Sequence, residues 1–289
     1  MVNLSKLGKC ISFHSYKGGT GKTTIATNFS FLLASKGYSV YLLDLDFYAP
    51  SLYSYFDIEP NLWINDYLID NASIDDIMID AKAYLKPEFK GELYLGFSKG
   101  GKDDIYQLEG NLNSDKEQKL KQFRNFISMR EEILIGREAD FIIMDTSPGI
   151  RYWSINSIVV SDIVLLTLKM GDLDLKGTIK MINEIYSSLI ESGSICKLLL
   201  NRVSGYCIPS QNKDVREFEA NVESQYLQKV KKMISNTVPE SIKVGTLAEI
   251  PCYCDIQFKE REYLTVSELP NHPFSIKIDE LVEKIKDYA

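Results

Sequence analysis

Short apolar runs alternate with helix-like patterns along almost the whole chain of 289 residues. Runs that are apolar on both faces are typical of parallel strands, which helices cover on both sides of a sheet. The alternation predicts an α/β fold with a mostly parallel, twisted and doubly wound sheet. We expect strands at 10–13, 38–43, 93–97, 141–144, 163–168, 196–200 and 243–250, and helices at 23–36, 116–135, 173–190, 215–235 and 275–288.

A single domain, residues 1–289, accounts for this alternation. The sequence contains no internal repeat, low-complexity segment or Pro- or Gly-rich linker. Two stretches, near 61–112 and 204–241, exceed what a minimal sheet of this kind needs. Insertions on an α/β scaffold usually lie on the surface, where they either decorate the fold or carry specificity for a partner.

The composition is that of an acidic globular protein. There are 33 Lys and Arg residues against 40 Asp and Glu residues, which gives a net charge of −7. This balance provides no long-range attraction to nucleic acid or anionic lipid. The five cysteines are an odd number, which argues against a disulfide framework. The two histidines are too few for a His-rich zinc site. No apolar run resembles a signal peptide or a membrane span. We therefore expect a cytoplasmic protein.

A glycine-rich loop joins the first expected strand to the first expected helix. It consists of Lys17, Gly18, Gly19, Thr20, Gly21, Lys22, Thr23 and Thr24. Such a turn directs backbone N–H groups toward one point, and the helix N-terminus adds partial positive charge, so the loop is suited to phosphate groups. Lys22 can reach the β- and γ-phosphates, Thr23 can bind Mg²⁺, and Thr24 can contact the α-phosphate. The common pattern G-x-x-x-x-G-K-[ST] is not met, because its first glycine would fall on Tyr16.

The x-K-G-G-x-G-K-T-T pattern of this loop resembles the deviant Walker A motif of the MinD/ParA group of ATPases, which includes the nitrogenase iron protein and the Mrp-type iron–sulfur carriers. The resemblance is strong at 9–56, 139–170 and 196–202, and extends to 247–263. It implies a P-loop NTPase fold that binds ATP with Mg²⁺ and hydrolyses the ATP to ADP and phosphate. Lys17 to Thr24 are then expected to hold the nucleotide.

Carboxylates follow two of the expected strands, at the edge of the sheet where sites in open α/β folds lie. Asp44 and Asp46 leave the second strand, and Asp145 leaves the fourth. The resemblance implies that all three are near Mg²⁺ through water, that Asp46 orients the attacking water, and that Pro148-Gly149 is the second switch. A different interpretation is that Asp44 or Asp46 caps the helix that Ala49 begins.

The first lysine of the loop has a separate role in the family that the loop resembles. There it reaches across a dimer interface to the partner's nucleotide. Its positive charge acts on the partner's phosphates in the same way as an arginine finger that a second protein supplies. The resemblance therefore implies an ATP-bound homodimer in which Lys17 is catalytic together with Lys22 and Asp46. The alternative for Lys17 is a solvated loop lysine.

Residues for the nucleotide base are expected at the ends of two later strands. Asn201 resembles the family's base-reading Asn, because its amide offers both a donor and an acceptor to adenine. Arg202 would flank the purine, and Pro251 resembles the proline that lines the base pocket. The alternative for Asn201 is that it satisfies a turn at the end of its strand.

Three further features decide between related functions. Cys252 and Cys254 differ by one residue from the Cys-x-x-Cys of Mrp-type carriers, and we expect them to be buried, inert thiols. The apolar face of helix 275–288 is expected to pack on the sheet and not to anchor a membrane. The lysines of helix 215–235 are expected to form a solvated face. They are Lys229, Lys231 and Lys232.

The resulting hypothesis is an ATP-dependent dimerising switch that acts in spatial positioning or partitioning of a cellular cargo. Its turnover is expected to be slow unless an activating protein partner stimulates it. Two alternatives are an ATP-dependent iron–sulfur cluster carrier of the Mrp type and an ATP-gated DNA-binding partition protein. DNA binding is not favoured, because the chain is acidic overall.

Overall fold

One sheet runs through the described part of the chain. The computed structural model describes residues 8–83, 90–109, 116–191, 193–203 and 215–288. The sheet has eight strands in the order β3-β4-β2-β5-β1-β6-β7-β8, and all neighbours are parallel except β3 and β4. The strands are β1 Lys9–His14, β2 Ser39–Leu45, β3 Met78–Asp80, β4 Glu92–Gly96, β5 Phe141–Thr146, β6 Ile163–Lys169, β7 Ile195–Val203 and β8 Val244–Pro251.

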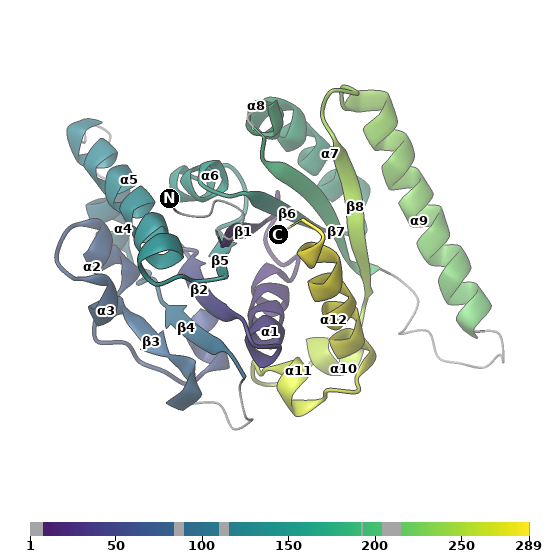
Figure 1. Ribbon diagram of the computed structural model, residues 1–289. Helices are drawn as coiled ribbons and strands as arrows, with labels where there is room; N and C mark the ends of the chain where they lie inside the picture. Colours follow the sequence, from purple (N-terminus) through teal and green to yellow (C-terminus); the bar gives the residue numbers. More distant parts are fainter. Residues whose placement is uncertain (1–7, 84–89, 110–115, 192, 204–214, 289) are drawn as a thin grey trace.

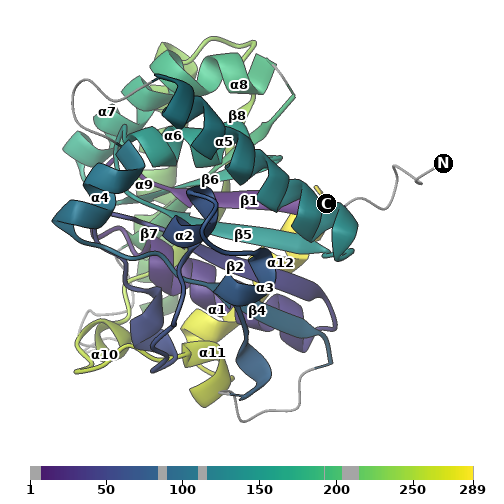
Figure 2. The same ribbon diagram turned by 90° about the vertical axis from the view of Figure 1, so that its left-hand side faces the viewer.

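Helices cover both faces of the sheet (Figures 1 and 2). One face carries α1 Lys22–Ser35, α11 Thr265–Glu268 and α12 Pro273–Lys286. The other face carries α2 Ile64–Leu68, α3 Ile74–Ile77, α5 Lys116–Glu131, α6 Tyr152–Val159, α7 Asp172–Met181, α8 Ser187–Glu191 and α9 Val215–Thr237. Two further short helices are α4 Lys102–Glu109 and α10 Cys254–Gln257. The long helix α9 runs beside the edge strand β8 (Figure 1).

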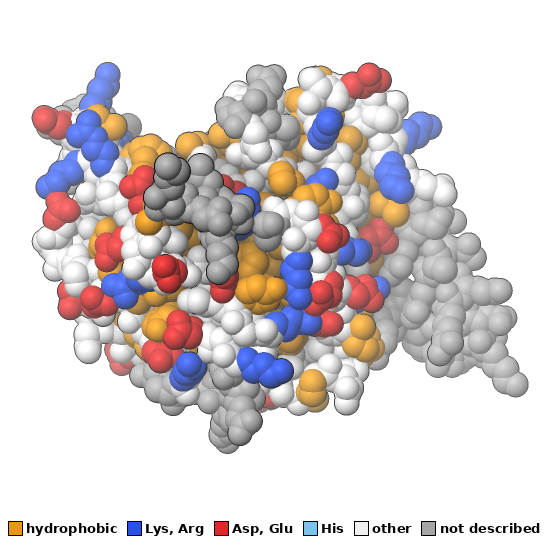
Figure 3. Space-filling model, in the orientation of Figure 1, with side chains coloured by type: hydrophobic (Ala, Val, Ile, Leu, Met, Phe, Trp, Pro, Cys, Tyr) orange, Lys and Arg blue, Asp and Glu red, His pale blue; other side chains and the backbone are white. Residues whose placement is uncertain are grey.

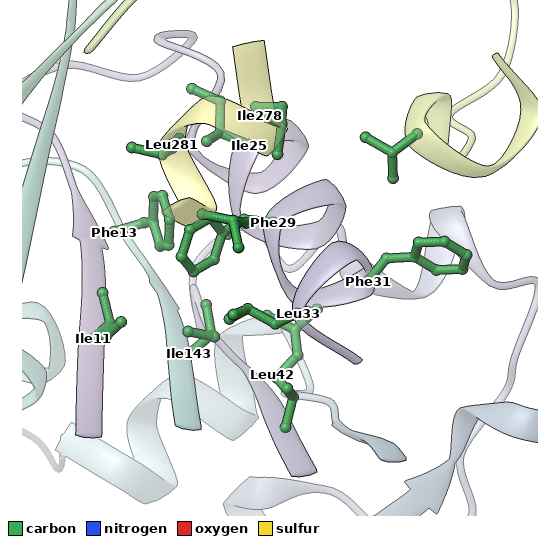
Figure 4. Packing of buried hydrophobic residues seen from close by; sticks show 14 of the residues in the cluster. Ile11, Phe13, Ile25, Phe29, Phe31, Leu33, Leu42, Ile143, Ile278 and Leu281 are labelled. Atoms are coloured by element: carbon green, nitrogen blue, oxygen red, sulfur yellow. The ribbon is translucent and has the colours of Figure 1, made fainter. Parts of the chain in front are cut away.

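The packing of α1 shows why the central strands are buried on both faces. Ile25, Phe29 and Leu33 recur every four residues, so they share one side of the helix, and all are fully buried. Phe29 meets Phe13 of β1 edge to face at a centroid distance of 5.6 Å. Figure 4 shows Leu281 of α12 in the same cluster.

Helix α12 packs on the sheet as expected. Its apolar residues Ile278, Leu281, Val282 and Ile285 are fully buried. Pro273 stands in the first turn, and the His272 side chain accepts a hydrogen bond from the backbone N–H of Phe274. Within the described residues, no helix is long and apolar enough to cross a membrane.

The seven expected strands are all present, and the predicted fold class is confirmed. Strand β3 was not expected from the sequence; it is a three-residue edge strand inside the 61–112 stretch and pairs antiparallel with β4. Two expected helices are interrupted by single π-helical turns, at Glu132–Gly136 and Ile182–Tyr186. Residues 84–89, 110–112 and 204–214 of the two predicted insertions lie outside the described residues.

Strand β1 lies in the middle of the sheet, between β5 and β6. The chain leaves β1, forms α1, and returns to β2 on the far side of β5. The carboxyl end of β1 is therefore next to the point where strand connections diverge, which is the usual place for a ligand in an open α/β sheet.

Candidate nucleotide site

The loop after β1 has the backbone that its glycines predict. Gly19 and Gly21 have φ angles of +70° and +88°, a region that favours glycine. At Gly21 a Cβ atom would lie only 2.4 Å from Nδ2 of Asn201. That amide in turn donates a hydrogen bond to the backbone oxygen of Thr20, at 2.7 Å. The end of β7 therefore supports the loop directly.

A cavity of about 440 Å³ opens over this loop. It brings together residues that are far apart in sequence, from the loop, from the end of β2 and from the end of β5. The predicted residues that line it are Gly18, Gly19, Gly21, Lys22, Thr23, Thr24, Asp46 and Arg202. Its size and its ring of backbone and hydroxyl donors suit a nucleotide phosphate chain.

The two loop lysines occupy different places. Lys22 is only 7% exposed and lines the cavity, whereas Lys17 is half-buried and does not line it. The backbone oxygen of Lys17 accepts a hydrogen bond from Oγ of Ser15 at 2.7 Å, which fixes the start of the loop. Only one of the two cations therefore faces a nucleotide bound by the same chain.

Two buried carboxylates lie side by side near the carboxyl ends of β2 and β5. Asp44 and Asp145 are paired in register on the neighbouring strands β2 and β5. Oγ1 of Thr23 donates to Oδ2 of Asp145 at 2.5 Å, while Oδ1 of Asp145 has no hydrogen-bond partner among the described residues. Burial raises the pKa of both carboxyls, and the proximity of Asp145 raises that of Asp44 further. The oxygen set of Thr23 and Asp145 therefore fits a hard divalent cation such as Mg²⁺.

Asp44 itself is used by the backbone. Its Oδ1 accepts from the N–H of Asp46 at 3.0 Å, and its Oδ2 accepts from the N–H groups of Ser51 and Leu52 at 3.1 and 3.0 Å. The bonds from Ser51 and Leu52 satisfy N–H groups at the start of the short 3₁₀ helix Leu52–Tyr55. The capping interpretation of the sequence thus describes the observed contacts of Asp44, and its role near Mg²⁺ stays a prediction.

Asp46 faces the cavity. Its Oδ1 accepts a hydrogen bond from Oγ of Ser147 at 2.7 Å and one from the N–H of Ala49 at 3.1 Å. The segment 147–149 is also tied to the phosphate loop, since the N–H of Gly149 donates to the backbone oxygen of Ser15 at 2.8 Å. Asp46, the loop after β5 and the phosphate loop are therefore linked without a ligand.

A second, smaller cavity of about 90 Å³ adjoins the first at Gly21 and Thr24. It is lined by the three residues predicted for the base, which are Asn201, Arg202 and Pro251. One N–H of Asn201 is already used by the loop, so its oxygen and its second N–H are left for a base. Arg202 has a φ of +55°, a strained conformation for a residue other than glycine that is more common at functional sites.

His14 is a fully buried residue beneath the site. The hydroxyl of Thr146 donates to the backbone oxygen of Phe13, so Nδ1 of His14 must donate to that hydroxyl, 2.7 Å away. Nε2 then carries the lone pair, and it has no hydrogen-bond partner among the described residues. Burial, and to a smaller extent Lys22, lowers the pKa of His14 to about 3. The ring is therefore neutral at physiological pH.

This buried ring predicts an acid-sensitive fold. Unfolded His14 takes up a proton below its ordinary pKa of 6.5, whereas the folded ring stays neutral down to about 3, so stability is lost as the pH falls through this range. Between pH 7 and pH 4 we expect wild type to lose about 3 kcal/mol more of its unfolding free energy than His14→Gln. Urea unfolding of both proteins at both pH values measures the two losses of unfolding free energy. The buried carboxylates are present in both proteins, so their contribution cancels in the comparison. Equal losses in the two proteins would contradict it.

The cysteines after β8 differ from the prediction of two buried thiols. Both are half-buried, because the chain turns toward the surface between β8 and α10. Cys254 is disulfide-bonded, and the thiol of Cys252 donates to Oε1 of Gln257. The described residues contain no group of three or more His, Cys, Asp and Glu side chains arranged to hold a metal ion.

Several residues at the site were not predicted from the sequence. Tyr55 donates from its hydroxyl to Oγ1 of Thr24 at 2.9 Å, and Glu262 lines both cavities. Ser147 directly precedes Pro148-Gly149, the pair expected to act as a switch. This neighbourhood is the sequence signal that could have identified Ser147 as a site residue. Tyr48 and Arg151 also line the larger cavity. No local pattern marks them, because they meet only in the folded chain.

A central phosphate loop on a mostly parallel sheet defines a P-loop NTPase. Residues 8–194 match the AAA domain family AAA_31. The uncharacterized protein MJECL24 of Methanocaldococcus jannaschii is 26% identical over 275 residues, which are 94% of this chain and 96% of that protein. A cytosolic Fe-S cluster assembly factor NUBP2 homolog of Nematostella vectensis is 31% identical over 136 residues, 47% of this chain and 43% of that protein. The septum site-determining protein MinD of Pyrococcus horikoshii, complexed with Mg-ADP, has a similar structure, with a TM-score of 0.66, 19% identity and 96% of each chain covered.

The chain belongs to the MinD/ParA family of P-loop ATPases. The family binds nucleotide and Mg²⁺, as the Mg-ADP complex illustrates. The cavity over the loop suits a nucleotide, and Oδ1 of Asp145, which no described residue bonds, suits the cation.

Proposed function

We propose that the protein is an ATP-dependent switch that dimerises around bound Mg-ATP and separates after hydrolysing it to ADP and phosphate. The observation that carries this proposal is the placement of the two loop lysines. Lys22 lines the cavity of its own chain and Lys17 does not, so Lys17 is left to serve a second copy. A cation given in trans couples dimerisation to turnover, because neither chain alone has the complete set of charges.

The residues of the site take roles that follow from their contacts. Thr23 and Asp145, the latter through water, hold Mg²⁺, whose chemistry is to neutralise the charge of the phosphates. Asp46 orients the attacking water. Ser147 holds the Asp46 carboxylate in place by a hydrogen bond. Asn201, Arg202 and Pro251 surround the base in the smaller cavity. We propose that these parts belong to one domain, residues 1–289, with the 61–112 and 204–241 stretches as insertions.

Lys17→Ala tests the proposal. We expect it to bind Mg-ATP within about twofold of wild type, because the side chain does not line its own cavity. We expect it to lower ATP turnover by about 100-fold, since charge donated in trans to the phosphates supplies a large part of catalysis in such systems. Phosphate release and calorimetric binding measure the two quantities. Wild-type turnover in this variant would contradict a trans lysine.

The biological setting follows from the relatives by analogy. MinD of Pyrococcus horikoshii is a septum site-determining protein, and we propose that this chain likewise acts in spatial positioning or partitioning of a cargo. Turnover that is slow in isolation and stimulated by a protein partner would suit a switch. A cytoplasmic location is part of the same proposal.

The two alternatives have less support. The NUBP2 homolog favours a carrier of iron–sulfur clusters, but Cys254 is disulfide-bonded and Cys252 bonds Gln257. For DNA binding, Lys229, Lys231 and Lys232 are exposed as expected, yet Lys229 pairs with Asp172. On the face shown in Figure 3, basic and acidic side chains are interspersed. Neither alternative is therefore proposed further.

A further inference from the structure

Arg151 is a cation at the phosphate cavity that the proposed function does not use. It stands two residues beyond Gly149, at the residue directly before α6. Its side chain is exposed, and it lines the same cavity as Lys22 and Asp46. The chain therefore places a cation from the segment after β5 on this cavity, beside Lys22 and Arg202.

The guanidinium of Arg151 contacts an aromatic ring at the rim of this cavity. It lies over the ring of Tyr48 at 4.5 Å from the centroid, a cation–π contact. Tyr48 follows Asp46 by two residues and lines the cavity as well. Its hydroxyl donates a hydrogen bond to Oε1 of Glu109. The ring that carries the guanidinium is thus fixed from the other side by a carboxylate.

Glu109 is the last residue of α4, which belongs to the 61–112 stretch. Glu109 does not itself line the nucleotide cavity, but its carboxylate bonds Tyr48, which does. Burial and Glu109 raise the pKa of the Tyr48 hydroxyl, whereas Arg151 lowers it, so both side chains lie close to the same hydroxyl. The insertion therefore supplies the carboxylate that fixes the ring on which the guanidinium lies.

The terminal phosphate of a bound nucleotide would compete with the Tyr48 ring for the guanidinium of Arg151. The segment 147–149 connects to both Asp46 and the phosphate loop, through the bonds of Ser147 and Gly149. Pro148 lies beside Gly18, since a Cβ at Gly18 would be 3.8 Å from Cγ of the proline. The guanidinium fork matches phosphate oxygens in two parallel hydrogen bonds, and such charge-assisted bonds are stronger than an exposed cation–π contact.

We propose that Arg151 binds the terminal phosphate of ATP within the same chain, and that Tyr48 and Glu109 hold it aside when the cavity contains ADP or no nucleotide. This inference rests on the proposed function, because it requires that the cavity bind ATP. It gives the 61–112 insertion a definite role, which is to set how strongly the site distinguishes ATP from ADP. Arg151 acts in cis, in contrast to Lys17.

The test is calorimetric titration of the full chain with Mg²⁺ and either AMP-PNP or ADP. For Arg151→Ala we expect the Kd of AMP-PNP to rise about tenfold or more and that of ADP to change less than twofold, since one charge-assisted contact is lost. Arg151→Lys keeps the charge without the fork and is expected to lie between the two. Glu109→Gln weakens the holding contact, so the Kd of AMP-PNP should fall about threefold while that of ADP stays constant.

Arg261 offers a matched control. It is an exposed arginine that lines a neighbouring cavity with Tyr55 and Glu262 but does not line the phosphate cavity. Arg261→Ala should leave both Kd values unchanged. If Arg151→Ala binds both nucleotides as wild type does, or loses both equally, the inference is wrong while the proposed function stands. If wild type binds neither nucleotide, the proposed function is wrong and the inference with it.

Discussion

Lys22→Ala is expected to lower ATP turnover by about 100- to 1,000-fold. Lys22 is the one loop lysine that lines the cavity, and it is almost fully buried beneath it. A fixed positive charge in such a place stabilises the charge that develops on the transferred phosphoryl group, and removing one donor of this kind costs two to three powers of ten. Steady-state phosphate release at saturating Mg-ATP measures the loss.

Lys36→Ala is the control for this substitution. Lys36 directly follows the same helix α1, but its ammonium pairs with Asp279 and Glu283 of α12, far along the chain. We expect its removal to leave turnover within about twofold, because exposed ion pairs contribute little and the site is untouched. Turnover in Lys22→Ala at more than a tenth of wild type would mean that the loop does not carry the chemistry.

Asp46→Ala is expected to lower turnover by a similar factor while Mg-ATP still binds. The carboxylate faces the cavity, and Ser147 and the N–H of Ala49 hold one of its oxygens in place. A carboxylate oriented in this way positions water for attack, but it adds no favourable charge to the phosphates, so its loss affects the reaction more than binding. We expect the Kd for Mg-ATP to change by less than about threefold.

Comparison of binding and turnover for Asp46→Ala separates two roles. A variant that hydrolyses ATP at the wild-type rate would show that Asp46 only caps the turn at Ala49, as the alternative interpretation of the sequence states. A variant that no longer binds Mg-ATP would show that Asp46 belongs to the binding apparatus and not to the attack on phosphate.

The sheet and the phosphate loop could be predicted because their signals are local. Seven apolar runs became seven strands, since burial on both faces demands apolar residues throughout. Gly19 and Gly21 have the positive φ angles for which glycine is selected. β3 was missed because three residues of an edge strand leave no period to detect.

Contacts between distant segments could not be predicted in the same way. The motif predicts that Asp44 lies near a metal. Its three bonds to backbone N–H groups depend on the course of residues 46–52 in the folded chain, which the motif does not encode. Arg151, Tyr48 and Glu109 come from three separate segments and meet over one cavity. The cysteines after β8 were misjudged, since apolar neighbours in sequence do not ensure burial.

The mass of Asp46→Ala with and without Mg-ATP tests the central claim, an ATP-dependent dimer, most directly. The variant retains Lys17 and Lys22, and slow hydrolysis should keep the ATP-bound state populated. Size-exclusion chromatography with light scattering is predicted to give the 32.9 kDa of one chain without nucleotide and twice that mass with Mg-ATP. The mass of a single chain under both conditions would contradict the dimeric switch and the trans role of Lys17.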